Sequence, residues 1–233
     1  MQTFYDRLTQ FRSQLDDCER QYGRPANSVQ LLAVSKTQPP TELRNAFAAG
    51  QRAFGENYLQ EALEKCMALS DLPLEWHFIG HIQSNKTSVI AQHFHWVHSV
   101  DRLKIAERLS AQRPAQLAPL NICLQVDLDA EPQKGGVAPT ELRALACAVN
   151  ALPNLRLRGL MALPTPREDF AAQRQSLARL QNLFRALAEE LNTKTQNHFD
   201  TLSMGMSDDW PAAVAEGATM IRIGTALFGA RRA

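Results

Sequence analysis

Lys36 is the residue of this sequence that is best placed to do chemistry. It ends the apolar stretch LLAVSK, which has the composition of a buried strand, and prolines follow it at positions 39 and 40. In water a lysine amine is almost entirely protonated, but desolvation or a neighbouring cation favours the neutral, nucleophilic form. A lysine after a strand more often only reaches into solvent. Lys36 is therefore a candidate nucleophile only if other segments build a binding site beside it.

Two segments near the carboxyl terminus could supply an anion site. SMGMSDDW leads from an expected strand through a glycine turn to an expected helix with Ser207 as N-cap, where unpaired amides attract anions. RIGTALFG ends the last expected strand, where Gly224 allows close approach of a ligand and Thr225 adds a hydroxyl. Taken singly, each segment is ordinary turn chemistry. Together with Lys36 they indicate a site for a phosphorylated aldehyde that the lysine holds as an imine.

Arg222 lies two residues before Gly224 on the last expected strand. Pyridoxal phosphate (PLP) is a phosphorylated aldehyde that proteins hold on lysine, and its pyridine nitrogen needs a partner in the protein. Arginine does not readily give up its proton, so it would keep this nitrogen unprotonated and weaken the cofactor as an electron sink. Arg222 is therefore the expected partner of the ring nitrogen.

The elements that must position these residues alternate along the chain. After an opening helix at about residues 2–21, short apolar strands alternate with amphipathic helices. The expected strands are Val29–Ser35, Arg52–Glu56, Trp76–Gly80, His95–Val100, Asn121–Leu128, Arg156–Leu163, Phe199–Gly205 and Thr219–Gly224. This alternation predicts a (β/α)8 TIM barrel, in which reactive groups gather at the carboxyl ends of the strands. A doubly wound open sheet is the alternative, but neither GxGxxG nor GxxxxGK[ST] follows the first strand.

Composition argues against several classes of function. The 233 residues carry 25 Lys plus Arg and 24 Asp plus Glu, a formal charge of +1, and 7% are aromatic. We therefore expect no nucleic-acid partner, because such binding needs a basic excess or stripe. No linker divides the chain, which favours a single domain over residues 1–233. The absence of a signal peptide or membrane-spanning run, and four scattered cysteines, indicate a cytoplasmic protein with reduced thiols and no membrane partner.

Several motifs, in order from about Val29 to Arg231, resemble one family closely. They are LLAVSKT, FGENYLQEALEK, WHFIGHIQSNK, LRGLMAL, TLSMGMSDDW and MIRIGTALFGAR, and the family is that of the pyridoxal phosphate homeostasis proteins. The resemblance implies a barrel of the type III PLP fold, like the amino-terminal domain of alanine racemase, with an extra helix at the amino terminus. It also implies a covalent imine between PLP and Lys36.

The same resemblance assigns the cofactor site residue by residue. The implied cofactor-binding residues are Lys36, Asn57, His77, Met161, Ser203, Met206, Ser207, Arg222, Gly224 and Thr225. Ser207, Gly224 and Thr225 would hold the phosphate, with Ser203 and Met206 adjacent. Asn57, His77 and Met161 would line the pocket. In the loop AEPQKGGV, Lys134 and Gly136 match the family and could give a secondary anion or PLP contact, although a solvated loop lysine is the commoner case.

Two further groups of residues invite other functions. In HFHWVH, strand alternation would put His93 and His95 on one face and His98 on the other, with no cysteine nearby, so we expect no metal site. Asp208 and Asp209 could form an acid–base pair. Adjacent acids in the first turn of a helix more often complement its dipole.

Two functions are compatible with such a site. One is a PLP-binding homeostasis protein that holds the cofactor and delivers it without turnover, with PLP-dependent apo-enzymes as candidate partners. The other is a PLP-dependent amino-acid racemase, which needs a base on each face of the substrate carbon. In alanine racemases the second base is a tyrosine from an additional domain across a dimer, whereas here Tyr5, Tyr22 and Tyr58 all lie near the start of the chain. We therefore expect a monomeric carrier and no catalytic residues.

Overall fold

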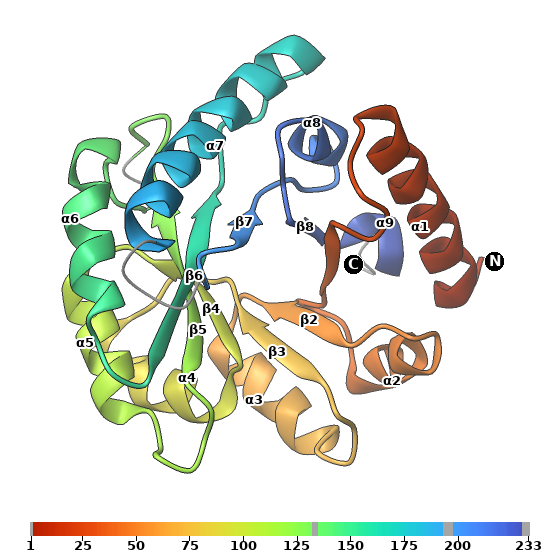
Figure 1. Cartoon of the computed structure of the whole chain (residues 1–233). Coiled ribbons are helices and arrows are strands. Elements are labelled where there is room, and N and C mark those ends of the chain that lie inside the picture. The colour runs from red at the N-terminus through yellow and green to blue at the C-terminus, as the bar shows by residue number, and fades with distance from the viewer. Residues whose placement is uncertain (1, 132–134, 193–197, 230–233) are drawn as a thin grey trace.

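Eight parallel strands form a closed barrel in chain order in the computed structural model, which describes residues 2–131, 135–192 and 198–229 (Figure 1). The strands are β1 (Gln30–Val34), β2 (Ala53–Glu56), β3 (Glu75–Phe78), β4 (Trp96–Val100), β5 (Leu120–Val126), β6 (Leu155–Ala162), β7 (Thr201–Ser203) and β8 (Met220–Ile223). Pairing of β1 with β8 closes the barrel. The predicted TIM barrel is confirmed.

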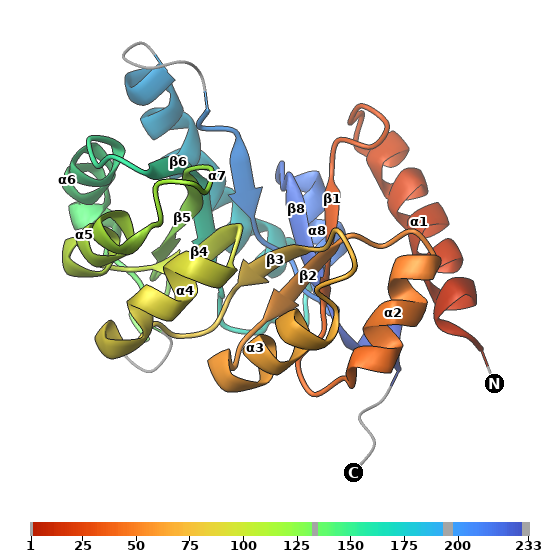
Figure 2. The ribbon, with the colours of Figure 1, turned by 90° about the horizontal axis from the view of Figure 1, so that it is seen from below.

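Helices follow the strands and surround the barrel (Figure 2). They are α1 (Phe4–Gln21), α2 (Pro40–Ala48), α3 (Leu59–Ala68), α4 (Thr87–His93), α5 (Leu103–Gln112), α6 (Pro139–Asn150), α7 (Phe170–Asn192), α8 (Trp210–Ala215) and α9 (Thr225–Phe228), with a 3-10 turn at Ser84–Lys86. Their buried residues recur at helical spacing, as in α5, where Ile105, Ala106 and Leu109 face the strands. Apolar burial on these faces therefore attaches each helix to the sheet.

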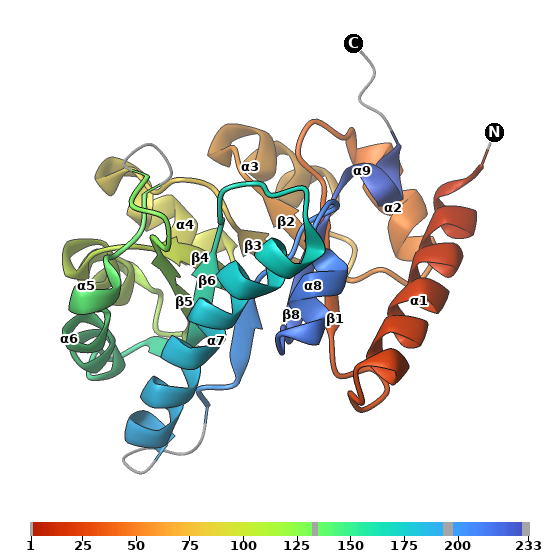
Figure 3. The same cartoon turned by 90° about the horizontal axis from the view of Figure 1, so that it is seen from above.

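The extra helix α1 covers the seam where the first and last strands meet. Thr3 and Asp6 form a capping box that starts it. Figure 3 shows α1 beside α2, α8 and α9, and its aromatic side chains anchor it there. The ring of Phe4 lies 5.0 Å from that of Phe228, and Phe11 lies 5.1 Å from Trp210. The helix thus braces the seam from outside.

Strand alternation separates two apolar regions. One set of side chains packs outward against the helices, and the other fills the barrel interior. On one side of the interior lie Leu32, Ala53 and Met220, and on the other Trp96, Cys123 and Met161. The interior is a packed core, so a ligand can bind only at an end of the barrel. The end formed by the carboxyl ends of the strands is called the mouth.

The element boundaries differ from the sequence predictions in three informative places. The strand predicted at Phe199–Gly205 is limited to Thr201–Ser203, because Phe199 stacks on Phe184 and Gly205 takes a φ of 94°. His93 ends α4, so placing it on the face of a strand was wrong. Ser207 is not an N-cap, because the residue before α8 is Asp209. None of the described helices is long and apolar enough to span a membrane.

Candidate functional site

The seam between β1 and β8 brings the two ends of the chain to one place. Leu32 pairs with Arg222 and Ala33 with Ile223. On its other side, the end of β1 is bonded to β2, because Ser35 donates its amide hydrogen to Gly55 O (3.0 Å). Lys36 therefore leaves the barrel at the carboxyl end of β1, partly buried, beside the strand end that carries Arg222 and Gly224.

A buried ion-pair network holds the turn that carries Lys36. Lys65 Nζ donates to Ser35 O (2.6 Å), Glu56 Oε1 (2.7 Å) and Glu61 Oε1 (2.6 Å). Glu56 Oε1 also accepts from Ser35 Oγ (2.5 Å), and Glu61 Oε1 accepts from the amide of Thr37 (2.5 Å). The Lys65 ammonium thus holds Ser35 directly, and it holds Thr37 indirectly through Glu61.

This network explains an unusual backbone conformation beside the lysine. Thr37 has a φ of 66°, which a β-branched residue rarely adopts. Lys65 and Glu56 are almost completely buried, and burial raises the pKa of Glu56, an effect that the Lys65 charge opposes. Sequence reasoning missed these residues. The signal was available in FGENYLQEALEK, where Glu61 and Lys65 lie one helical turn apart.

Arg222 and Ser203 are brought together as a buried pair. Arg222 Nη1 donates to Ser203 O (2.7 Å) and Oγ (2.8 Å), and Nη2 donates to Ala162 O (2.9 Å). Complete burial lowers the pKa of Arg222 to about 10, so the guanidinium is still a cation at neutral pH. Three hydrogen bonds fix its plane on the carboxyl side of β7 and β8.

His77 and Met161 lie in the barrel interior. His77 is fully buried and stacks on Trp96, with 5.3 Å between ring centroids. Both of its ring nitrogens have protein partners, Glu75 Oε1 at 2.7 Å and His98 Nε2 at 2.9 Å. Met161 packs with Trp96 in the same interior layer. These two residues therefore support the mouth from below.

His98 is a second interior histidine that sequence reasoning assigned no role. Its Nδ1 lies 3.0 Å from Ser203 Oγ. Burial lowers the pKa of His77, and lowers that of His98 well below its usual value. The available signal was alternation, since His98 lies two residues from the buried Trp96. Among the residues that the structure describes, no group of three or more His, Cys, Asp and Glu is placed to hold a metal ion.

The turn after β7 presents Met206 and Ser207 on the other side of the mouth. Ser207 is exposed, and Met206 is partly buried. Asp209 Oδ1 accepts from the Met206 amide (2.6 Å) and so holds the turn. Burial raises the pKa of Asp209, whereas Asp208 is exposed. Of the two acids, only Asp209 thus holds the turn, and the turn presents the Ser207 hydroxyl at the surface.

Gly224 and Thr225 follow β8 and begin the short helix α9. A Cβ added to Gly224 would meet Val34 O at 3.4 Å, in the gap between β8 and β1. Thr225 is exposed, and Gly224 O accepts from the amides of Leu227 and Phe228. A loop after the last strand that leads into a short extra helix is the usual phosphate site of this fold.

Asn57 adds an unsatisfied acceptor at the end of β2. Its Oδ1 is buried and has no hydrogen-bond partner among the described residues. Its backbone is closely packed, because a Cβ at Gly80 would meet Asn57 O at 2.0 Å. A buried amide oxygen without a partner costs free energy, which a ligand donor would recover. The donor set at the mouth thus fits a ligand that carries an aldehyde, an anion and polar ring substituents.

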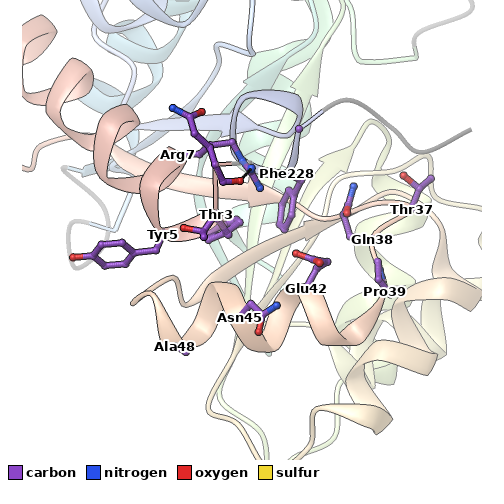
Figure 4. Close-up of a pocket in the computed structure, with 13 residues that line it drawn as sticks. Thr3, Tyr5, Arg7, Thr37, Gln38, Pro39, Glu42, Asn45, Ala48 and Phe228 are labelled. Carbon is purple, nitrogen blue, oxygen red and sulfur yellow. Dashed lines mark hydrogen bonds between the residues drawn. The ribbon is translucent and has the colours of Figure 1, made fainter.

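A cavity of about 720 Å³ adjoins this mouth without containing it (Figure 4). It lies between the start of α1, the turn after Lys36, α2 and α9, and its lining includes Arg7, Gln38, Glu42 and Phe228. In Figure 4 the Tyr5 side chain extends away from the other lining residues. None of the predicted cofactor residues lines this cavity, although Thr37 and Gln38 follow Lys36 directly. Lys134 lies outside the described residues.

Comparison with known proteins agrees with this arrangement. The family model of the alanine racemase N-terminal domain matches residues 7–232. A pyridoxal phosphate homeostasis protein of Pseudomonas aeruginosa is 59% identical over 99% of this chain and 97% of its own length, and one of Escherichia coli K12 is 48% identical over 96% and 95%. PipY of Synechococcus elongatus PCC7942, solved with PLP bound, has a TM-score of 0.85 and 42% identity over 97% of this chain and 100% of its own. The chain therefore belongs to the family of pyridoxal phosphate homeostasis proteins, within the wider family of alanine racemase N-terminal domains.

Proposed function

We propose that this protein binds PLP at the mouth of the barrel, with Lys36 as its covalent partner through an imine. The observation that carries the proposal is the pairing of β1 with β8. It sets Lys36 beside Arg222, Gly224 and Thr225, although these residues lie at opposite ends of the chain. A related protein, PipY, has been solved with PLP bound.

The residues around Lys36 have complementary tasks in this proposal. Gly224, Thr225 and Ser207 would bind the phosphate through backbone amides and hydroxyl groups, with Met206 and Ser203 adjacent. Asn57 Oδ1 would accept a hydrogen bond from the ligand. His77 and Met161 would shape the floor of the pocket from the interior.

Arg222 would face the pyridine nitrogen and limit what the cofactor can do. The anchored guanidinium is a cation at neutral pH and a hydrogen-bond donor only. Bound PLP supplies an aldehyde and an electron-accepting ring, and a donor that keeps its proton leaves the ring nitrogen unprotonated. The ring is then a weaker electron sink, which favours holding the cofactor over using it.

The positions of the tyrosines support a carrier rather than a racemase. Racemisation requires a base on each face of the substrate carbon. Tyr5 and Tyr22 belong to α1 and its end, outside the barrel, and Tyr58 is exposed before α3. None of the three tyrosines lies inside the barrel. We therefore propose that the protein holds PLP for transfer to apo-enzymes and does not turn over substrate. We also propose that it is a single-domain, monomeric and cytoplasmic protein.

Loss of the cofactor signal in Lys36→Ala tests the covalent assignment. Protein loaded with PLP should show an imine absorption band that borohydride removes, and Lys36→Ala should lack this band. Lys104→Ala, at an exposed lysine on α5, is the matched control and should keep it. A Lys36→Ala variant with the wild-type spectrum would refute the assignment. Racemisation of any common amino acid at about 1 per second or faster would refute the carrier.

A further inference from the structure

A continuous chain of polar side chains crosses the barrel interior from Arg222 to Glu75. Arg222 Nη1 lies 2.8 Å from Ser203 Oγ, which lies 3.0 Å from His98 Nδ1. His98 Nε2 lies 2.9 Å from His77 Nδ1, and His77 Nε2 lies 2.7 Å from Glu75 Oε1. Strands β8, β7, β4 and β3 each contribute to it. The cofactor mouth is thus linked to the opposite end of the barrel.

Hydrogen-bond chemistry gives this chain a direction. The arginine can only donate and the glutamate carboxylate can only accept, whereas a neutral imidazole does each once. His77 Nε2–H must donate to Glu75, so His77 Nδ1 accepts from His98 Nε2–H. His98 Nδ1 then accepts from the Ser203 hydroxyl, which in turn accepts from Arg222. Every bond is satisfied with both histidines neutral and protonated on Nε2.

The opposite direction would need a proton on Glu75. Its hydrogen bond to His77 lowers the pKa of Glu75, and burial lowers the pKa of both histidines. Glu75 interacts with His77, His95 before β4 and Gln30 of β1. Arg222 interacts with Asp209, Cys123 and His98. Glu75 is therefore the group that sets the direction of the chain.

The two ends of this series of hydrogen-bonded side chains, Glu75 and Arg222, have different surroundings. The Glu75 side chain is 41% exposed and lines a cavity of about 550 Å³ with Arg12, Asp16 and Arg52. Arg222, in contrast, is 3% exposed. Water therefore reaches the chain at the carboxylate end, while the guanidinium end is fixed within the protein.

We propose that Glu75, His77 and His98 are positioning residues that act on Arg222 through Ser203. The carboxylate fixes both imidazole tautomers, and these orient the Ser203 hydroxyl so that Arg222 keeps its proton and its plane. The part of this inference that concerns the cofactor rests on the proposed function. The part that concerns the tautomers does not.

Nitrogen-15 NMR of the unloaded protein tests the tautomers first. We expect His77 and His98 both to be neutral with hydrogen on Nε2, and we expect Glu75→Gln to change this pattern, because a carboxamide both donates and accepts. Asp16→Asn is the matched control, since it removes a charge from the same cavity without touching the chain. Nδ1–H tautomers in the wild type, or an unchanged pattern in Glu75→Gln, would overturn the proposal.

The absorption of PLP-loaded protein then tests the effect on the cofactor. In Glu75→Gln the direction of the hydrogen bonds is no longer fixed, so His98 Nδ1–H can donate to Ser203 Oγ and compete there with Arg222. Arg222 is then held less firmly, and the pH midpoint of the imine absorption band should shift. Asp16→Asn should not shift it. If Glu75→Gln has the wild-type midpoint, the positioning role fails while PLP binding stands. If wild-type protein forms no imine but shows the expected tautomers, the proposed function fails, and the inference about the hydrogen-bonded side chains from Arg222 to Glu75 stands.

Discussion

The two sides of the barrel mouth are built in opposite ways. Around Lys36, a buried ammonium and two carboxylates fix the turn after β1 through five short contacts. On the other side, the hydroxyl groups of Ser207 and Thr225 are exposed. Ser207 lies on the turn after β7, which the Met206 amide holds through Asp209 Oδ1, and Thr225 begins α9. In the proposed function these two sides have different tasks. The fixed turn would position Lys36 as the covalent partner, and the exposed hydroxyl groups would bind the phosphate.

Removal of Lys65 should have the largest effect and would test the rigid side. Lys65→Met leaves the buried Glu56 carboxylate without its ion pair, so we expect a loss of about 3 kcal/mol in the free energy of unfolding, measured with urea. Adding Glu56→Gln should recover part of that loss. Lys104→Met at an exposed position should change it by less than about 0.5 kcal/mol. A Lys65→Met loss no larger than that of the control would show that the network does not hold the turn.

Acid should destabilise the protein through His77 and His98, the buried histidines in the barrel interior below the mouth. A histidine whose pKa is lowered in the folded state contributes stability that is full above its unfolded pKa, ~6.5, and is lost as pH falls below it. We expect the free energy of unfolding to drop by about 1 kcal/mol for each of His77 and His98 between pH 7 and about 5.5. Glu56 acts with the opposite sign, because its pKa is raised.

The histidine contribution is therefore read as a difference between variants. His98→Gln should weaken the pH dependence, and His93→Gln, at an exposed position, should leave it unchanged. Equal pH dependence in all three proteins would contradict a buried neutral His98.

A negative charge at Ser207, on the exposed side of the mouth, should weaken PLP binding and leave the free energy of unfolding almost unchanged. Ser207→Asp places a carboxylate near the proposed phosphate site, so PLP affinity should fall about tenfold or more through like-charge repulsion. The free energy of unfolding should stay within about 0.5 kcal/mol of wild type, because Ser207 is exposed. Ser70→Asp, also exposed, should alter neither quantity. Undiminished affinity in Ser207→Asp would place the phosphate elsewhere.

The sequence could predict the features that depend on local patterns, but not those that depend on contacts between distant segments. The placement of Lys36, Arg222 and Gly224 at neighbouring strand ends was predictable, because strand ends and motifs are local features and the barrel rule places strand ends together. Lys65 and His98 had only weak local signals, the helical spacing from Glu61 and the alternation with Trp96, and Glu75 had none. The contacts of these residues could not be predicted locally, because each depends on partners from other strands or helices. Ser207 was predicted as an N-cap, but the helix begins three residues later at Trp210. Local patterns thus predicted which residues lie at the carboxyl ends of the strands, and only the folded structure shows which side chains fix them there.

The most direct test is to locate the covalent bond itself. Wild-type protein loaded with PLP is reduced with borohydride, digested and analysed by mass spectrometry. We expect one stoichiometric pyridoxyl adduct on the peptide that contains Lys36, and none on the peptide that contains Lys65. An adduct spread over surface lysines, or no adduct on Lys36, would contradict the claim that the seam of β1 and β8 forms the cofactor site.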